Sequence, residues 1–123
     1  MDTVDESELR NEIERQGLVV SRWQDVLLEH YPPLLESYLD WARSGEQLTE
    51  IDSKTKEFLI IALDCAVRWP SPFIDNHIRK ALREGASVVE VIEVIGVTAH
   101  LLGPHMMNHG LSALANVLES GWE

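Results

Sequence analysis

Three ionisable residues, Glu57, Asp64 and Arg68, interrupt the apolar stretch EFLIIALDCAVRW. At 3.6 residues per turn, a helix over this stretch brings all three to roughly the same side. A buried charge must be paired or hydrogen-bonded, so this side is expected to face a partner, a cleft or its rim. The Trp-Pro-Ser-Pro break that follows puts His77 about one turn into the next helix. These two helices are therefore the best candidate for a site.

His77 and Glu57 are the residues whose types suit proton transfer. An imidazole titrates near neutral pH, so His77 could act as a general acid or base. It could instead be a structural histidine at a helix start, bound to Asp75 or to a backbone group. Glu57 could orient His77 or take a proton itself. It could equally be a first-turn acid that the helix dipole favours.

Asp64 and Arg68 are four residues apart, so their simplest role is an ion pair within one helix. A guanidinium also suits two-point contact with a carboxylate. Both residues are therefore candidates for substrate binding.

His105 and His109 have the same spacing in the last expected helix, and such a pair can share a metal ion. A third ligand would come from His77, His100 or a carboxylate. Histidines that are exposed or satisfied by other groups are commoner than metal ligands. We expect no cofactor, with a divalent metal on His105 and His109 as the alternative.

The composition places limits on the class of protein. The chain has 123 residues, 45% of them hydrophobic and 25% charged, and a formal net charge of −11. That charge argues against nucleic acid or an anionic membrane surface as a partner. Neither a membrane-spanning run nor a signal peptide is expected, so we predict a cytoplasmic protein. Cys65 is the only cysteine, which excludes an internal disulfide and a CxxC pair, and we expect it to be an inert core residue.

Apolar periodicity and turn residues predict an all-α fold of six or seven helices. Ser87 and Glu90 form a capping-box pattern, which favours a helix over the Val- and Ile-rich stretch that follows. This stretch is apolar nearly all round, so we expect part of it to be buried against another subunit. The expected helices cover 5–16, 21–30, 33–45, 54–69, 72–84, 88–102 and 105–120.

From about Trp23 onward the chain resembles the carboxymuconolactone decarboxylase family, which includes the alkylhydroperoxidase-D-like proteins. The resemblance rests on DSKTKEFLIIAL, HIRKALREGASVVEVIEV and GPHMMNHGLSAL. It implies a helical bundle domain at 21–123, preceded by an N-terminal helical extension at 1–20. It also implies self-association as a trimer or hexamer.

The redox branch of that family carries CxxC just before the histidine that corresponds to His77. Those two cysteine positions fall on Pro70 and Phe73, neither of which can form a thiolate, and Cys65 lies more than a turn upstream. A dithiol peroxidase needs an attacking thiolate and a resolving thiol. We therefore expect no dithiol peroxidase activity.

The decarboxylase branch lacks the cysteines and keeps the histidine. Glu57 matches the family's glutamate, although its spacing to His77 is one residue longer than in the redox branch. Asn108-His109 falls near that branch's Asn-His, which follows a Gly-x-Pro turn, whereas the turn here is Gly103-Pro104-His105.

The resemblance implies a non-redox lyase or isomerase acting on a small carboxylated or lactone metabolite, as in aromatic compound catabolism. His77 would be the proton donor, and Glu57 would adjust its proton affinity. His109 would be a second polar residue that lines the site. Arg68 or the start of the last helix at His105 would hold the substrate's negative charge. The alternatives are a non-catalytic ligand-binding or assembly protein and a His-ligated metalloprotein.

Overall fold

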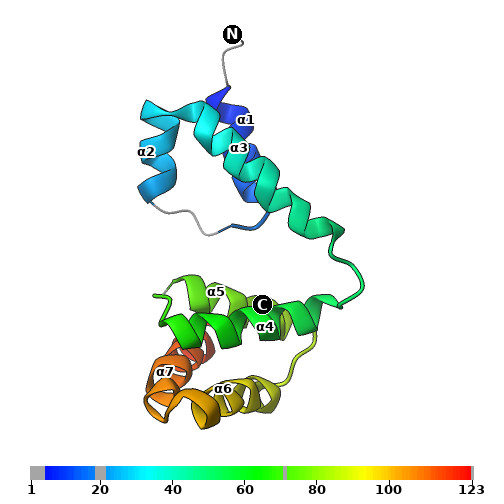
Figure 1. Cartoon of the computed structure of the whole chain (residues 1–123), viewed down its shortest axis with the longest axis vertical. Coiled ribbons are helices and arrows are strands. Elements are labelled where there is room, and N and C mark those ends of the chain that lie inside the picture. The colour runs from blue at the N-terminus through cyan, green and yellow to red at the C-terminus, as the bar shows by residue number, and fades with distance from the viewer. Residues whose placement is uncertain (1–4, 19–21, 71, 123) are drawn as a thin grey trace. The chain divides into compact units, whose positions relative to one another are not determined.

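A computed structural model describes residues 5–18, 22–70 and 72–122 of the chain. Within these ranges the chain forms seven α-helices and one short 3-10 helix, and it contains no strand, which confirms the all-α prediction. The helices are α1 (Glu6–Arg15), α2 (Arg22–His30), α3 (Pro32–Arg43), η1 (Ser44–Gln47), α4 (Ser53–Val67), α5 (Phe73–Arg83), α6 (Val88–Leu102) and α7 (His105–Ser120) (Figure 1).

The chain divides into two compact units, residues 1–50 and residues 51–123. In the first unit, Leu9 and Ile13 of α1 are buried in the same small core as Leu28, Leu35 and Leu39 of α2 and α3. Helix α1 therefore belongs with α2 and α3, because two apolar residues one turn apart attach it to their core. The predicted boundary, between residues 20 and 21, differs from this division.

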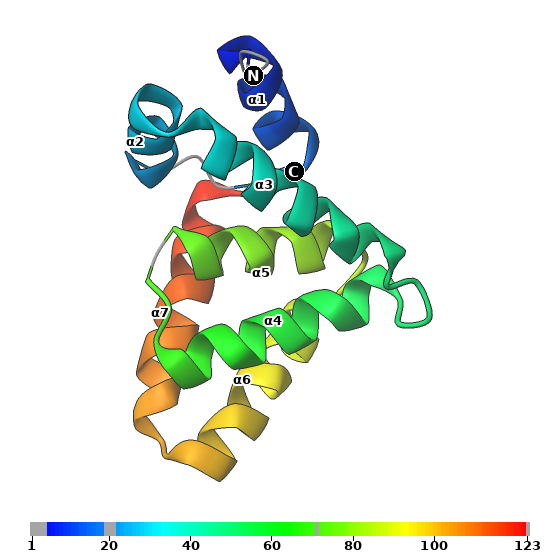
Figure 2. The ribbon, with the colours of Figure 1, turned by 45° about the horizontal axis from the view of Figure 1, so that its top comes forward.

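The second unit is a group of four helices, α4 to α7, around one core (Figure 2). The sequence between the helices is short, and each helix contributes apolar side chains at helical spacing. The segment after α7 is held to the end of α5, where Nε of Arg83 donates to the carbonyl of Trp122 at 2.6 Å. The largest fully buried side chains of this unit are Ile61, Cys65, Ile74, Ile78, Val91, Ile95 and Val117.

Most predicted helix ends are found within a residue or two. The Asp52 carboxylate accepts the backbone N–H of Thr55 at 2.7 Å, which caps α4. The predicted capping box is present at α6, where Ser87 and Glu90 bond reciprocally at 3.0 Å. The predicted N-cap at Ser71 lies outside the described residues, and Pro72 precedes the first residue of α5.

Helix α4 ends at Val67, two residues earlier than predicted. Arg68 has a left-handed backbone with φ 55°, the one positive φ at a non-glycine residue in the described part of the chain. The N–H of Trp69 then bonds the carbonyl of Asp64 at 2.7 Å, and the N–H of Arg68 bonds that of Cys65 at 3.2 Å. This pair of bonds closes the last turn in a Schellman motif. The chain can therefore turn toward Pro70, whose ring disfavours helix in the residue before it.

Helix α6 buries one side in the bundle and exposes the other. Val91 and Ile95 are fully buried, whereas Val89, Val97 and Leu101 are 61%, 63% and 77% exposed. The predicted excess of apolar surface on this helix is therefore present, and its burial against another subunit stays a prediction. No helix in the described ranges is long and apolar enough to span a bilayer.

Candidate functional site

Glu57 and His77 meet where the first half of α4 packs on α5. The Nδ1 atom of His77 lies 2.7 Å from Oε2 of Glu57. The two side chains are 25% and 15% exposed, so the contact is largely removed from water while the imidazole keeps an opening to it. Glu57 is thus a partner of the His77 ring, as the sequence analysis had considered.

This contact decides which ring nitrogen of His77 can react. With Glu57 ionised, the carboxylate accepts, so Nδ1 carries the hydrogen and Nε2 carries the lone pair. No hydrogen bond to Nε2 is found within the described ranges. A carboxylate behind an imidazole fixes the ring's orientation and stabilises the imidazolium form. The pair thus has the geometry of a general base that can later act as an acid.

His109 of α7 joins this region through the connection between α4 and α5. Its Nε2 donates to the carbonyl oxygen of Trp69 at 3.0 Å. Because a carbonyl can only accept, Nε2 carries a hydrogen and Nδ1 is left for another partner. The side chain is half-buried. The structure therefore brings His109 to the α4–α5 connection, as a polar group beside the site.

Asp64 lies two turns beyond Glu57 on α4 and is half-buried. Its Oδ2 atom is enclosed, with no hydrogen-bond partner among the described residues. Burial raises the pKa of the Asp64 carboxyl, and Glu57 raises it further, whereas His77 and His109 lower it. Glu57, His77 and His109, which come from three helices, therefore all act electrostatically on Asp64.

Arg68 is not part of this cluster. It is exposed, and the predicted ion pair with Asp64 is absent from the described structure. The prediction was wrong because it assumed that the helix continues to residue 69. The left-handed backbone at Arg68 breaks the i, i+4 geometry that such a pair requires.

The remaining histidine candidates lie on the surface. His105 begins α7 and is exposed, and its ring packs over Gly103, where a Cβ atom would be 2.7 Å from the His105 Cε1. His100 is exposed on α6. The described residues hold no group of three His, Cys, Asp or Glu side chains that could bind a metal ion. The third ligand needed by His105 and His109 is thus not found there.

Cys65 is fully buried between α4 and α7. Burial, with a smaller contribution from the Asp64 charge, raises the pKa of its thiol to about 11. Cys65 is therefore a neutral thiol at physiological pH and a poor nucleophile. Pro70 and Phe73, which the resemblance aligned with two cysteines, carry no thiol, and the Phe73 ring centroid lies 5.6 Å from that of Trp69.

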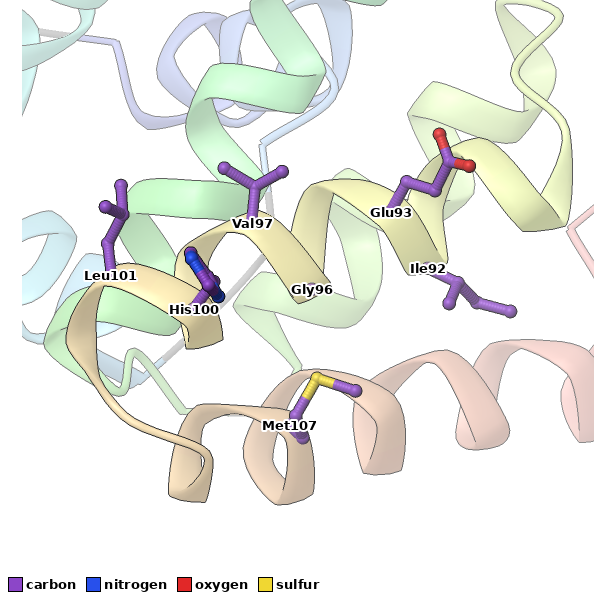
Figure 3. A pocket seen from close by; sticks show the side chains of 7 residues that line it. All are labelled: Ile92, Glu93, Gly96, Val97, His100, Leu101 and Met107. Atoms are coloured by element: carbon purple, nitrogen blue, oxygen red, sulfur yellow. The ribbon is translucent and has the colours of Figure 1, made fainter.

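A shallow groove of about 550 Å³ runs along α6, and neither Glu57 nor His77 lines it. Figure 3 shows Met107 reaching from α7 toward the α6 residues that form the rest of the lining. Glu93 and His100 are its ionisable residues. The sequence analysis did not predict this groove.

The outer face of α4 is a second feature that the sequence analysis missed. Leu59, Leu63 and Val67 are 50%, 64% and 67% exposed. Their spacing of four residues, which puts them along one side of a helix, is the signal that could have shown this apolar stripe.

Comparisons with known protein families, with curated proteins and with solved structures find no match to this chain.

Proposed function

We propose that the protein is a non-redox lyase or isomerase that uses His77 and Glu57 to move a proton on a small carboxylated or lactone substrate. The observation that carries this proposal is the 2.7 Å contact between His77 Nδ1 and Glu57 Oε2. Its half-buried position protects the pair from full solvation, which strengthens the interaction between the groups. The resemblance to the decarboxylase branch supports the same roles.

In a decarboxylation, the electrons of the breaking carbon–carbon bond move into the substrate's conjugated system as CO₂ leaves. The imidazolium of His77 gives a proton from Nε2 to the carbon that receives those electrons. In an isomerisation, neutral His77 first takes a proton from one carbon and returns it to another. In both cases the Glu57 carboxylate stabilises the imidazolium, whose charge appears or disappears during the step.

Binding of the substrate's negative charge would fall to groups around this pair. His109, when protonated, can donate from Nδ1, because its Nε2 already bonds the Trp69 carbonyl. The start of α7 at His105 adds the positive end of the helix dipole, although the N–H groups of Met106 and Met107 already bond the carbonyls of Gly103 and Pro104. Arg68 can contribute only from outside the cluster, because it is exposed at the end of α4.

The second candidate function is that of a non-catalytic binding or assembly protein. It is favoured by the exposed apolar residues of α6, including Val97 and Leu101, and by those of α4, including Leu63. Apolar stretches of this kind on two helices are typical of interaction surfaces. The family resemblance supports self-association as a trimer or hexamer, which is compatible with either function.

A ligand screen followed by turnover assays separates the two functions. Wild type is screened by thermal shift against small aromatic-derived acids and lactones, and each stabilising compound is then tested for conversion. His77→Gln keeps hydrogen bonding but cannot cycle a proton, and His30→Gln, at an exposed histidine of α2, is the matched control. Conversion by wild type and His30→Gln, but not by His77→Gln, supports the enzyme. Equal binding by all three proteins without conversion favours the binding protein.

A further inference from the structure

Asp64 is a half-buried carboxyl that the His77–Glu57 mechanism does not use. Its Oδ2 atom is enclosed in the bundle and has no hydrogen-bond partner in the described residues. Unpaired buried polar atoms are few in folded proteins, because each costs the free energy of a lost hydrogen bond to water. An atom left in this state inside a cluster of titratable groups is therefore a candidate for a ligand contact or a proton store.

We propose that Asp64 is a second proton carrier of the same site and gives its proton to a carbonyl oxygen of the substrate while His77 takes one from carbon. This inference rests on the proposed function and assigns the two proton transfers to two residues. It favours isomerisation of an unsaturated acid or lactone, because that reaction needs an acid and a base together.

The surroundings of the two carboxyls on α4 divide their roles. Oε2 of Glu57 lies 2.7 Å from Nδ1 of His77. Oδ2 of Asp64 has no hydrogen-bond partner in the described part of the chain, and both burial and the neighbouring Glu57 raise the pKa of this carboxyl. Two carboxyls whose environments differ in this way are the usual basis of an acid and base assignment.

The proposed isomerisation transfers one proton at carbon and one at oxygen. Neutral His77 takes a proton from the carbon next to the carbonyl group, and the electrons of that C–H bond form a carbon–carbon double bond. The carbonyl π electrons move to oxygen, which receives the proton of Asp64, so that an enol, an imidazolium and a carboxylate result. The return steps deliver the His77 proton to the γ-carbon and the enol proton to Asp64, leaving the double bond shifted by one position.

The charges that face Asp64 are suited to the carboxylate that this step creates. They are Glu57 on its own helix, His77 on α5 and His109 on α7. Helix α6 also packs on α4, and its Glu90 is paired with Lys54 at 3.3 Å. During the step His77 becomes positively charged, so it opposes the repulsion from Glu57 at the moment Asp64 ionises.

The first test is a carbon-13 NMR titration of the aspartate carboxyls in the full chain, with Asp64 assigned from Asp64→Asn. We expect Asp64 to titrate above 3.8, its ordinary value. Glu57→Gln should move the midpoint down, because a negative neighbour is lost, and His77→Gln should move it up, because a positive one is lost. A midpoint at 3.8, or one that neither substitution moves, overturns the proposal.

The second test measures exchange of carbon-bound hydrogen with D₂O in a β,γ-unsaturated five-membered lactone, followed by proton NMR. Asp64→Asn should exchange about 10²-fold more slowly than wild type, a usual effect of losing one proton-transfer group. Asp25→Asn, at an exposed aspartate of α2, is the matched control and should match wild type. Exchange by Asp64→Asn at the wild-type rate overturns the role of Asp64 while leaving His77 as the base. No exchange by wild type overturns both the proposed isomerisation and the donor role of Asp64.

Discussion

The Nδ1 atom of His77 lies 2.7 Å from Oε2 of Glu57, although twenty residues separate them in the chain. The contact forms because α4 and α5 pack side by side after the turn through Pro70 and Pro72. It occupies Nδ1 of His77, whereas Nε2 has no hydrogen bond among the described residues.

Replacing His77 by Ala is expected to lower kcat by about 10²- to 10⁴-fold, the usual range for a positioned proton-transfer group. Glu57→Gln should lower kcat less and move the pH profile of kcat, because the amide cannot stabilise the imidazolium as a carboxylate does. The measurement is turnover of a ligand from the screen between pH 5 and 9. A structural role for His77 would instead leave kcat intact and lower only the melting temperature.

Asp64→Asn should stabilise the protein at pH 7. The raised pKa of Asp64 means that the folded state binds a proton more tightly than the unfolded state, so stability falls as pH rises from 3.8 through the folded value. The amide has no such dependence, and the difference between the two proteins should vanish below pH 3.8. Melting temperatures of the two proteins from below pH 3.8 to pH 7 measure this difference in stability. An equal gain at every pH would contradict its origin in the raised pKa of Asp64.

Gly110→Ala should destabilise the bundle by about 1–3 kcal/mol, the usual cost of overpacking a core. A Cβ atom there would lie 2.7 Å from Ile95 Cγ2 and 2.9 Å from Cys65 Sγ. Gly96→Ala in α6 is the matched control, because nothing lies within 4 Å of its Cβ position. That change should stabilise by up to about 1 kcal/mol through helix propensity alone. Chemical denaturation of both variants measures the contrast, and equal effects would contradict it.

Arg68→Gly is expected to raise stability by about 1 kcal/mol, because glycine adopts the left-handed conformation at this helix end without steric cost. Urea unfolding measures the gain. The same variant tests the predicted substrate contact, since carboxylate ligands should bind it more weakly than wild type only if the guanidinium holds them.

Self-association should bury the apolar residues of α6 and α4. Light scattering at micromolar concentration should therefore give a mass several times that of the chain. Leu101→Glu and Leu63→Glu should reduce that mass, because each buries a charge in the expected interface. Leu48→Glu, at an exposed leucine of the first unit, is the control. A monomeric wild type would remove the support for an oligomer.

Local signals in the sequence were enough to predict the helices and most of their ends. Periodic apolar residues, the Asp52 cap, the Ser87–Glu90 capping box and glycines at helix ends are local signals, and local hydrogen bonds and sterics produce their effects. The same local information identified His77 and Glu57 as residues suited to proton transfer. It also predicted that Cys65 would be a buried core thiol.

Which of these groups meet depends on how the helices pack. The left-handed turn at Arg68 separated it from Asp64, and the packing of α5 and α7 on α4 placed His77 and His109 near that carboxyl. The same packing enclosed Oδ2 of Asp64 without a hydrogen-bond partner in the described chain. Contacts between helices depend on crossing angles and on side chains far apart in sequence, so the spacing within one helix cannot specify them.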